Sequence, residues 1–485
     1  MDAMTRTRSH QRMAARVRVT MANDVIRSVG APVFWFSAVL LAAAFVFGGQ
    51  SRDNPLSTMM IELLGVALLA AMAWSRALAA TVRVGWPEAA LLGGMFLIPL
   101  LQLIPLPPSI WTTLPGRSEA VETLRLAGIE RGWAPISLDP EATFRCLLWL
   151  IPPAALFLAV ATLDAGARLR LVGLVLALCA ASLILGGLQI TDQDGGLFAS
   201  PDGDPTDLPI GFFANRNHQG IAMAASLPFA AAFAAIWGST AYQRSRPANV
   251  VFAALVALLI VGVLVTRSRA ALTLAGPALV ASLGLFWAAS GAKRLGREAA
   301  LMFGVAAIVL VFAAQFAISA VLDRFEDLTD GDGRFDIWAS TTNAAAAVAP
   351  AGAGLGTFEP FYRAWEPLNF MGPAFVNHAH NDYLELWLEA GGLAPLLLAA
   401  FLLWFGRASL KAWLAPETES TLLARAGGIA TLVLLAHSVV DYPLRTQALA
   451  CVFAIAAGCM SSGTMPPTSR PARLRTAPLR SKPHG

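Results

Sequence analysis

Residues 248–266 read ANVVFAALVALLIVGVLVT and contain no charged side chain. An α-helix rises 1.5 Å per residue, so a stretch of this length is enough to cross the roughly 30 Å hydrocarbon core of a bilayer. Similar stretches recur along the 485-residue chain, which is 56% hydrophobic and only 14% charged. An ordinary soluble domain is about 25% charged. The apolar runs do not alternate with polar residues as the strands of a β-barrel would. The sequence therefore excludes a water-soluble globule and predicts an all-α polytopic membrane protein.

The same pattern predicts about twelve transmembrane helices, bounded by charges, proline and glycine. They lie near residues 32–49, 56–75, 88–105, 144–163, 171–190, 217–238, 248–266, 270–289, 299–321, 383–405, 422–440 and 446–463. The first follows a basic tail that resembles a secretory signal. Its charge-free stretch from Ser28 to Ser51 is too long for a cleaved signal, so we expect a retained anchor.

Charges in the connecting segments predict the orientation. If the amino terminus is cytoplasmic, most of the 35 Lys and Arg residues fall in inner segments, and most of the 31 Asp and Glu residues fall in outer ones. Both termini are therefore expected in the cytoplasm. The expected organisation is a basic cytoplasmic tail (1–31), nine transmembrane helices (32–321), a large periplasmic loop (322–382), three transmembrane helices (383–463) and a disordered basic cytoplasmic tail (464–485).

Four polar motifs fall on the expected outer face. They are GFFANRNH (211–218), TRSR (266–269), GRFDIW (333–338) and NHAHNDY (377–383). Ionisable residues at a membrane are commonly functional. Guanidinium groups bind phosphate oxygens in pairs and stay charged when desolvated, and helix amino termini add backbone donors. An arginine-rich pocket at this boundary therefore predicts a site for a lipid-linked diphosphate.

Each motif also has a purely structural interpretation. Arg267 and Arg269 could complement the carboxyl end of the seventh span or extend to lipid headgroups. His218 could be a hydrogen-bonding residue between helices. Asp382, with the acidic residues three and seven positions later, could serve only to favour the start of a helix. Composition and spacing leave these alternatives open.

Other patterns point away from cofactors and metals. GAGLG (352–356) lacks the preceding strand of a nucleotide-binding loop. His378 and His380 have no firm third ligand for a metal. The four cysteines lie in apolar runs without the spacing of a zinc site or a disulfide framework. We expect no cofactor, no metal and no nucleic-acid partner.

Taken in order, these motifs resemble the O-antigen ligase and polymerase superfamily. The resemblance rests on GFFANRNH, then SR at 268–269, GRFDIW, GAGLGTF (352–358) and HNDYLELWLEAG (380–391), and it spans roughly residues 205–400. The later HSVVDYPLR (437–445) is similar to a segment of ligase-like members that serve exopolysaccharide clusters. Residues 1–200 share only hydropathy with the family.

The resemblance implies a membrane-embedded glycosyltransferase of GT-C-like architecture in the bacterial inner (cytoplasmic) membrane. It implies a donor glycan on undecaprenyl diphosphate, an acceptor glycan or lipid, and an active face in the periplasm among inner-membrane lipids. Arg216, Arg267 and Arg269 would bind the diphosphate, and His380 would stand beside the acceptor hydroxyl as base or orienter. Supporting positions would be Asn215, His218, Arg334, Asp336, His378, Asn381 and Asp382.

The chemistry is consistent with these roles. An acceptor hydroxyl attacks the anomeric carbon, arginines stabilise the charge on the departing diphosphate, and an imidazole accepts the proton near neutral pH. A single attack opposite the leaving group would invert the anomeric configuration. The sequence does not separate a ligase from a polysaccharide repeat-unit polymerase. The alternative from another class, a multi-span transporter or flippase, would place its charges at the membrane midplane rather than at the outer boundary.

Overall fold

The computed structural model describes residues 31–49, 54–75, 84–191, 210–240, 245–289, 304, 333–368 and 376–462. Within these ranges the chain is mostly helical, and eight helices are long and apolar enough to cross a membrane. The prediction of a polytopic helical membrane protein is confirmed. Both tails and most of the expected ninth span (299–321) lie outside the described residues.

Seven of the expected spans coincide with long apolar helices. These are α2 (Pro55–Trp74), α7 (Pro140–Trp149) continued by α8 (Ile151–Thr162), α9 (Ala165–Thr191), α10 (Arg216–Thr240), α11 (Ser245–Val265), α12 (Arg269–Ala289) and α18 (Glu419–His437). The eighth long helix is α17 (Leu393–Leu414). Three expected spans are shorter helices: Ala31–Phe47, α4 (Trp86–Gln102) and α19 (Gln447–Ser462).

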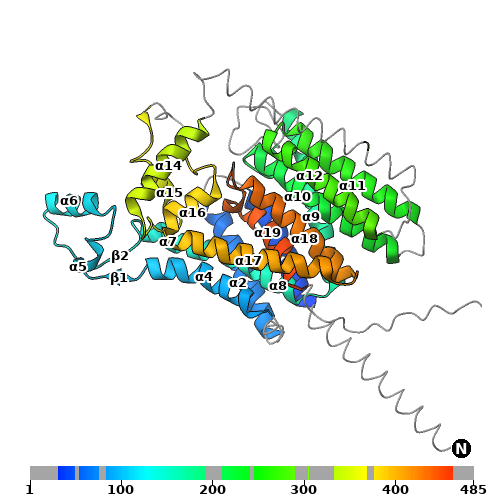
Figure 1. Ribbon diagram of the computed structural model, residues 1–485, viewed down its shortest axis with the longest axis horizontal. Helices are drawn as coiled ribbons and strands as arrows, with labels where there is room; N and C mark the ends of the chain where they lie inside the picture. Colours follow the sequence, from blue (N-terminus) through cyan, green and yellow to red (C-terminus); the bar gives the residue numbers. More distant parts are fainter. Residues whose placement is uncertain are drawn as a thin grey trace, which may run out of the picture.

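Among the eight long helices, α10 is the most buried, and it packs against α9, α11, α12 and α18 (Figure 1). Small residues allow this close packing, as is common between helices in membranes. At Gly220 a Cβ atom would come within 2.7 Å of the Ala271 side chain on α12 and 2.9 Å of Thr266. The start of α10 therefore lies directly beside the turn between α11 and α12.

The expected span 383–405 is two helices in the structure. Asn381 caps α16 (Asp382–Ala390) by accepting hydrogen bonds from the backbone N–H groups of Tyr383 and Leu384. Gly391, in the left-handed region with φ of +58°, then ends α16 beside Pro350. The apolar run at 393–414 forms α17. The transmembrane helix therefore begins about ten residues later than predicted, because α16 buries three acidic side chains within the protein.

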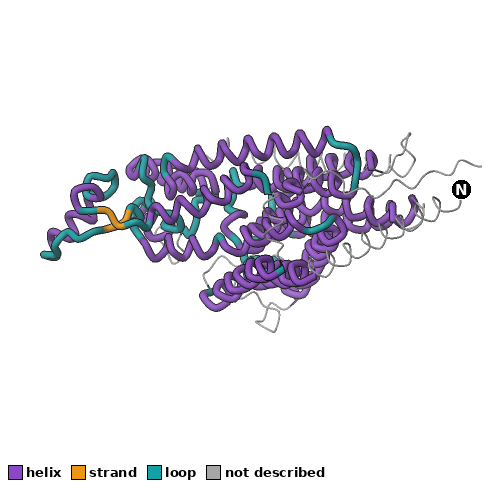
Figure 2. Tube along the Cα trace, turned by 90° about the horizontal axis from the view of Figure 1, so that it is seen from below, coloured by secondary structure: helices purple, strands orange, loops and turns teal. Residues whose placement is uncertain are grey.

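Two further helices cover α16. They are α14 (Arg334–Val348) and α15 (Phe358–Tyr362), and their side chains form a small apolar core with Leu388 of α16. A separate lobe extends from the bundle and contains β1 (Pro105–Leu106), α5 (Pro108–Trp111), α6 (Ser118–Leu126) and β2 (Ala134–Pro135). The two strands pair antiparallel and mark this lobe at one end of the molecule (Figure 2).

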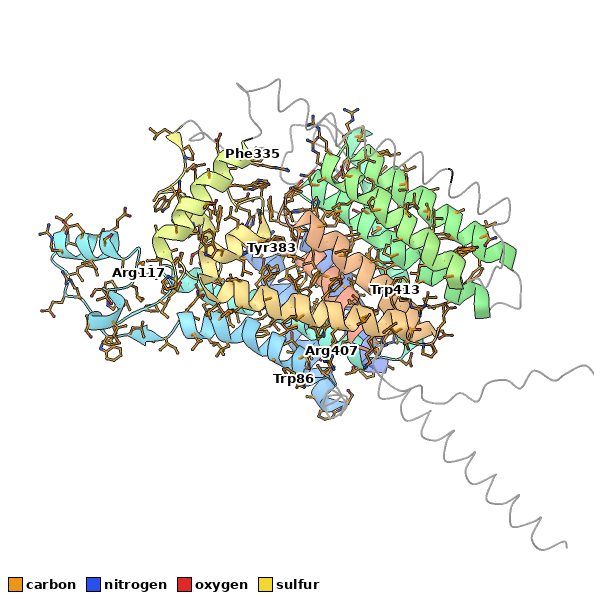
Figure 3. The ribbon with its side chains drawn as sticks, in the orientation of Figure 1. Trp86, Arg117, Phe335, Tyr383, Arg407 and Trp413 are labelled. Carbon is orange, nitrogen blue, oxygen red and sulfur yellow. The ribbon has the colours of Figure 1, made fainter. Side chains whose placement is uncertain are left out.

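Labelled side chains mark the two ends of the helix bundle. Figure 3 places Phe335 and Tyr383 near the start of α14 and α16, whereas Arg407 and Trp413 lie near the far end of α17. The segment 438–446 joins α18 to α19 at the first of these ends and includes a short 3₁₀ helix, η2 (Pro443–Arg445). The polar residues of interest gather around this connection.

Candidate functional site

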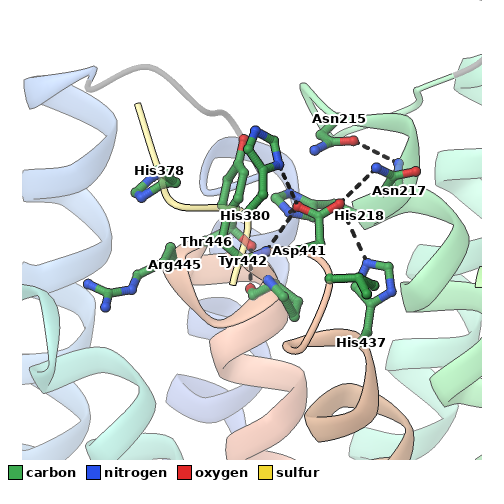
Figure 4. A network of polar contacts seen from close by, with 12 residues as sticks. Asn215, Asn217, His218, His378, His380, His437, Asp441, Tyr442, Arg445 and Thr446 are labelled. Atoms are coloured by element: carbon green, nitrogen blue, oxygen red, sulfur yellow. Dashed lines mark hydrogen bonds and ion pairs between the residues drawn. The ribbon is translucent and has the colours of Figure 1, made fainter. Parts of the chain in front are cut away.

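A buried carboxylate, Asp441, lies where four segments meet: the end of α18, the start of α10, the start of α14 and the residues before α16 (Figure 4). The side-chain amide of Asn217 donates a hydrogen bond of 2.7 Å to Asp441 Oδ2. The backbone N–H of Tyr442 donates one of 2.9 Å to Oδ1. The carboxylate is thus fixed in place by a side chain of α10 and by the backbone of its own connecting segment.

Three imidazoles surround the same carboxylate. The ring nitrogens of His380, His218 and His437 lie 3.5, 3.7 and 3.8 Å from its oxygens, which is longer than a hydrogen bond. The guanidinium of Arg334 lies 3.8 Å from Oδ2 and donates a hydrogen bond of 3.0 Å to the Val440 carbonyl. Asp441 therefore connects a cation at the start of α14 to histidines from three other segments.

This environment determines the charge of Asp441. Burial raises the pKa of its carboxyl, but the interactions with His218, His380 and His437 outweigh burial and hold the pKa well below its ordinary range. The group is a carboxylate at neutral pH. Both ring nitrogens of His218 and His437 are buried and have no hydrogen-bond partner among the described residues. Such groups are rare in native proteins and are typical of sites that bind a polar ligand or water.

Tyr442 separates this group from a second polar cluster. Its ring contacts three imidazole rings, with centroid distances of 4.3 Å to His378, 4.9 Å to His218 and 5.0 Å to His380. Figure 4 shows His378 and Arg445 on the side of Tyr442 opposite His437. His378 and His380 therefore lie in different surroundings, although only Ala379 separates them in the sequence.

The second cluster consists of Arg445 and the acidic face of α16. The guanidinium lies 2.8 Å from Glu389, 3.4 Å from Glu385 and 3.6 Å from Asp382. Glu385 is also 2.9 Å from His378 Nδ1, and it accepts a hydrogen bond of 2.8 Å from the Ala379 N–H. This network fixes the segment that carries both histidines against α16.

The carboxyls of the second cluster differ in their proton affinity. Burial raises the pKa of Asp382 to about 7, although the nearby Arg445 lowers it. Burial also acts to raise the pKa of Glu385, but Arg445 and His378 outweigh it and the pKa falls to about 2. The carboxylates raise the pKa of Arg445 even though burial lowers it. The cluster thus contains three acids and a single guanidinium.

The backbone is strained at two predicted site residues. In the described part of the chain, only Arg267 (φ +50°) and His380 (φ +49°) are non-glycine residues in the left-handed region. The His380 carbonyl accepts a hydrogen bond of 3.3 Å from the Trp338 indole, which helps to hold the conformation. Strained backbone of this kind clusters at functional sites. This observation favours a functional role for both residues.

The three predicted phosphate-binding arginines lie at adjacent helix starts. Arg216 begins α10 and Arg269 begins α12, while Arg267 lies in the turn just before; all three side chains are exposed. None of them forms an ion pair with another described residue. The positive ends of two helix dipoles meet here, which favours an anion. Because Gly220 contacts Thr266 and Ser268, these helix starts lie side by side.

Three remaining predicted residues lie at the starts of helices around the two clusters. Asn215 accepts a hydrogen bond from the Asn217 N–H at the start of α10, and Asn381 caps α16. Asp336 is exposed on the first turn of α14. Residues not predicted as part of the site include its central members Asp441 and Arg445, with His437 and Tyr442. All four lie in the HSVVDYPLR segment (437–445), whose resemblance to ligase-like members was the only sign in the sequence that they belong to the site.

Metal binding has no support among the described residues, since no three His, Cys, Asp or Glu side chains there could hold an ion. The comparison with curated proteins gives no match. Residues 252–399 match the model of the O-antigen ligase family. The matched segment contains Arg267, Arg269, Arg334, His378 and His380, whereas His218 and Asp441 lie on either side of it. This segment of the chain is therefore similar to the O-antigen ligase family, which supports the resemblance to the O-antigen ligase and polymerase superfamily.

Proposed function

We propose that the protein is an O-antigen ligase-like glycosyltransferase. It moves a glycan from undecaprenyl diphosphate to an acceptor hydroxyl at the periplasmic face of the bacterial inner membrane, in the synthesis of surface polysaccharide or lipopolysaccharide. The observation that carries the proposal is the position of His380, strained and 3.5 Å from the buried Asp441 carboxylate. Asp441 in turn contacts the start of α10, where Arg216 lies.

In this mechanism His380 accepts the proton of the acceptor hydroxyl as its oxygen attacks the anomeric carbon. The bond from that carbon to the diphosphate oxygen breaks, and the electron pair leaves with undecaprenyl diphosphate. Arg216, Arg267 and Arg269 stabilise the charge that develops on the leaving group, and Asp441 stabilises the imidazolium. The attack is opposite the leaving group, so the anomeric configuration inverts. The site uses neither metal nor nucleotide.

The arginines provide one test. Arg216→Lys and Arg269→Lys are each expected to lower glycan transfer by about tenfold or more, because lysine keeps the charge but loses the fork that binds two phosphate oxygens. Transfer would be measured with purified protein and a lipid-linked donor. Arg407→Lys, an exposed change near the far end of α17, is the matched control and should keep full activity. Arg244, another natural control, lies outside the described residues. Near wild-type transfer by both test variants would contradict phosphate binding by these arginines. It would leave only the interpretation that they contact lipid headgroups.

The stage of polysaccharide assembly provides another test. Deletion of the protein should cause complete, polymerised glycans to accumulate on undecaprenyl diphosphate, because a ligase acts after polymerisation. Mass spectrometry of extracted lipid-linked glycans measures this directly. Accumulation of single repeat units would instead identify a polymerase, and an unchanged lipid-linked pool would contradict both.

A further inference from the structure

A cavity of about 1200 Å³ lies among α2, α4, α7, α8, α16, α17 and α19. Its polar end contains His378 with the second cluster around Arg445, and Tyr442 forms part of the wall. Its body is mostly apolar, with Leu92, Met95, Leu397, Phe401 and Trp404 among the lining side chains, and Glu62 and Glu88 also line the cavity. A polar end joined to an apolar body suits an amphipathic molecule.

The charge of the polar end restricts which headgroup fits. Asp382, Glu385 and Glu389 line it around the guanidinium of Arg445, and the exposed Arg145 also lines the cavity. A diphosphate would meet an excess of like charge there, which is strongly unfavourable in a buried site. An uncharged head that carries hydroxyl groups would instead donate hydrogen bonds to these oxygens.

Gln447 supplies an independent indication of a ligand. Its side chain lines the cavity and the residue is only 4% exposed. Its amide nitrogen donates a hydrogen bond of 2.9 Å to the Trp149 carbonyl, but its amide oxygen has no hydrogen-bond partner among the described residues. A buried acceptor without a partner is unfavourable, and a hydroxyl donor in the cavity would offset that cost. His378, with Nδ1 directed to Glu385, has Nε2 left for the same head.

We propose that this cavity binds the acceptor, and that the acceptor is a lipid with an uncharged, hydroxyl-bearing head. The inference rests on the proposed function. The head contacts His378 and Gln447, and the acyl chain lies along α4 and α17. The two substrates are then sorted by charge: the anionic donor binds beside the exposed arginines, the neutral acceptor binds in the acidic cavity, and they meet at Tyr442.

The test is lipid binding by the full-length protein, measured by native mass spectrometry with three probes. These are monogalactosyl diacylglycerol (neutral, hydroxyl-bearing), phosphatidylglycerol (anionic) and farnesyl diphosphate (an anionic isoprenoid). We expect the galactolipid to bind at least tenfold more tightly than phosphatidylglycerol. Leu397→Trp, which places a larger side chain in the cavity, should weaken galactolipid binding about tenfold or more. Leu396→Trp, on an adjacent side chain that is 67% exposed, should leave it unchanged.

Gln447→Met is a second variant of similar size that removes the unpartnered oxygen, and it should weaken galactolipid binding several-fold. Loss of farnesyl diphosphate binding in Leu397→Trp, with galactolipid binding retained, would overturn the proposal and assign the cavity to the donor. Equal binding of all three probes in every variant would also overturn it. Binding does not require turnover, so galactolipid binding by a protein without transferase activity would contradict the proposed function alone.

Discussion

His380→Ala is expected to lower glycan transfer by about 10²-fold to 10⁴-fold, the usual contribution of a general base. The side chain is positioned from three directions: by the left-handed backbone at φ +49°, by the Trp338 hydrogen bond to its carbonyl and by the Asp441 carboxylate at 3.5 Å. Donor binding should persist, because the three arginines remain. Transfer and donor affinity would both be measured on purified protein.

His378→Ala is the matched comparison, because it changes the same residue type two positions away. We expect a milder loss of transfer, since this side chain contacts Glu385 rather than Asp441. Folded His380→Ala protein that transfers glycan at the normal rate, with EDTA present and no metal added, would refute the role of His380. A lower yield of folded protein with a normal rate per molecule would show that the residue only supports the loop.

Asp441→Asn is expected to destabilise the protein by about 1 to 3 kcal/mol at neutral pH, because the neutral amide is a weaker acceptor for the Asn217 and Tyr442 donors. The amide keeps the size of the side chain but removes the negative charge that lies 3.8 Å from the Arg334 guanidinium. Thermal unfolding of the purified protein in detergent measures the effect. Glu130→Gln, the same chemical change at an exposed position of the lobe, should have little effect.

The pH dependence of this effect has a defined sign. Because the folded-state pKa of Asp441 lies well below the ordinary value of 3.8, its carboxylate stabilises the fold fully above about pH 4. This stabilisation is lost as the pH falls from there toward the folded-state pKa. The difference between wild type and Asp441→Asn should therefore be largest at pH 7 and shrink below pH 4. A difference that stays constant to the lowest accessible pH would contradict the assigned charge.

Asp441 also has an expected effect on the reaction. As a positioning residue, it should hold the His380 imidazole in place and stabilise its protonated form during transfer, so its replacement should lower the rate per folded molecule. A residue that served only folding would lower the amount of active protein without changing that rate. The two roles are therefore separable in one set of measurements.

The sequence by itself predicted the long apolar helices well where a helix is uniformly apolar. Residues 248–266 coincide with most of α11, because burial of backbone hydrogen bonds in lipid leaves a long apolar segment few alternatives to a helix. The same rule misplaced the tenth span, since hydropathy averages over the acidic residues of α16. The acids are tolerated there because Arg445, about 60 residues later, supplies a buried counter-charge. Nothing within residues 383–405 encodes that partner.

The proposed site residues show the same division. The sequence by itself was enough to predict the family resemblance, the phosphate-binding arginines at two helix starts and His380 as the base. Each of these predictions depends on residues that are close together in the chain. Only the tertiary structure decided that Asp441 joins His218, His380 and Arg334, and that Tyr442 separates His380 from His378. The interaction of charged and polar groups depends on their distance and burial in space, and packing of α10 against α18 brings together residues more than 200 positions apart.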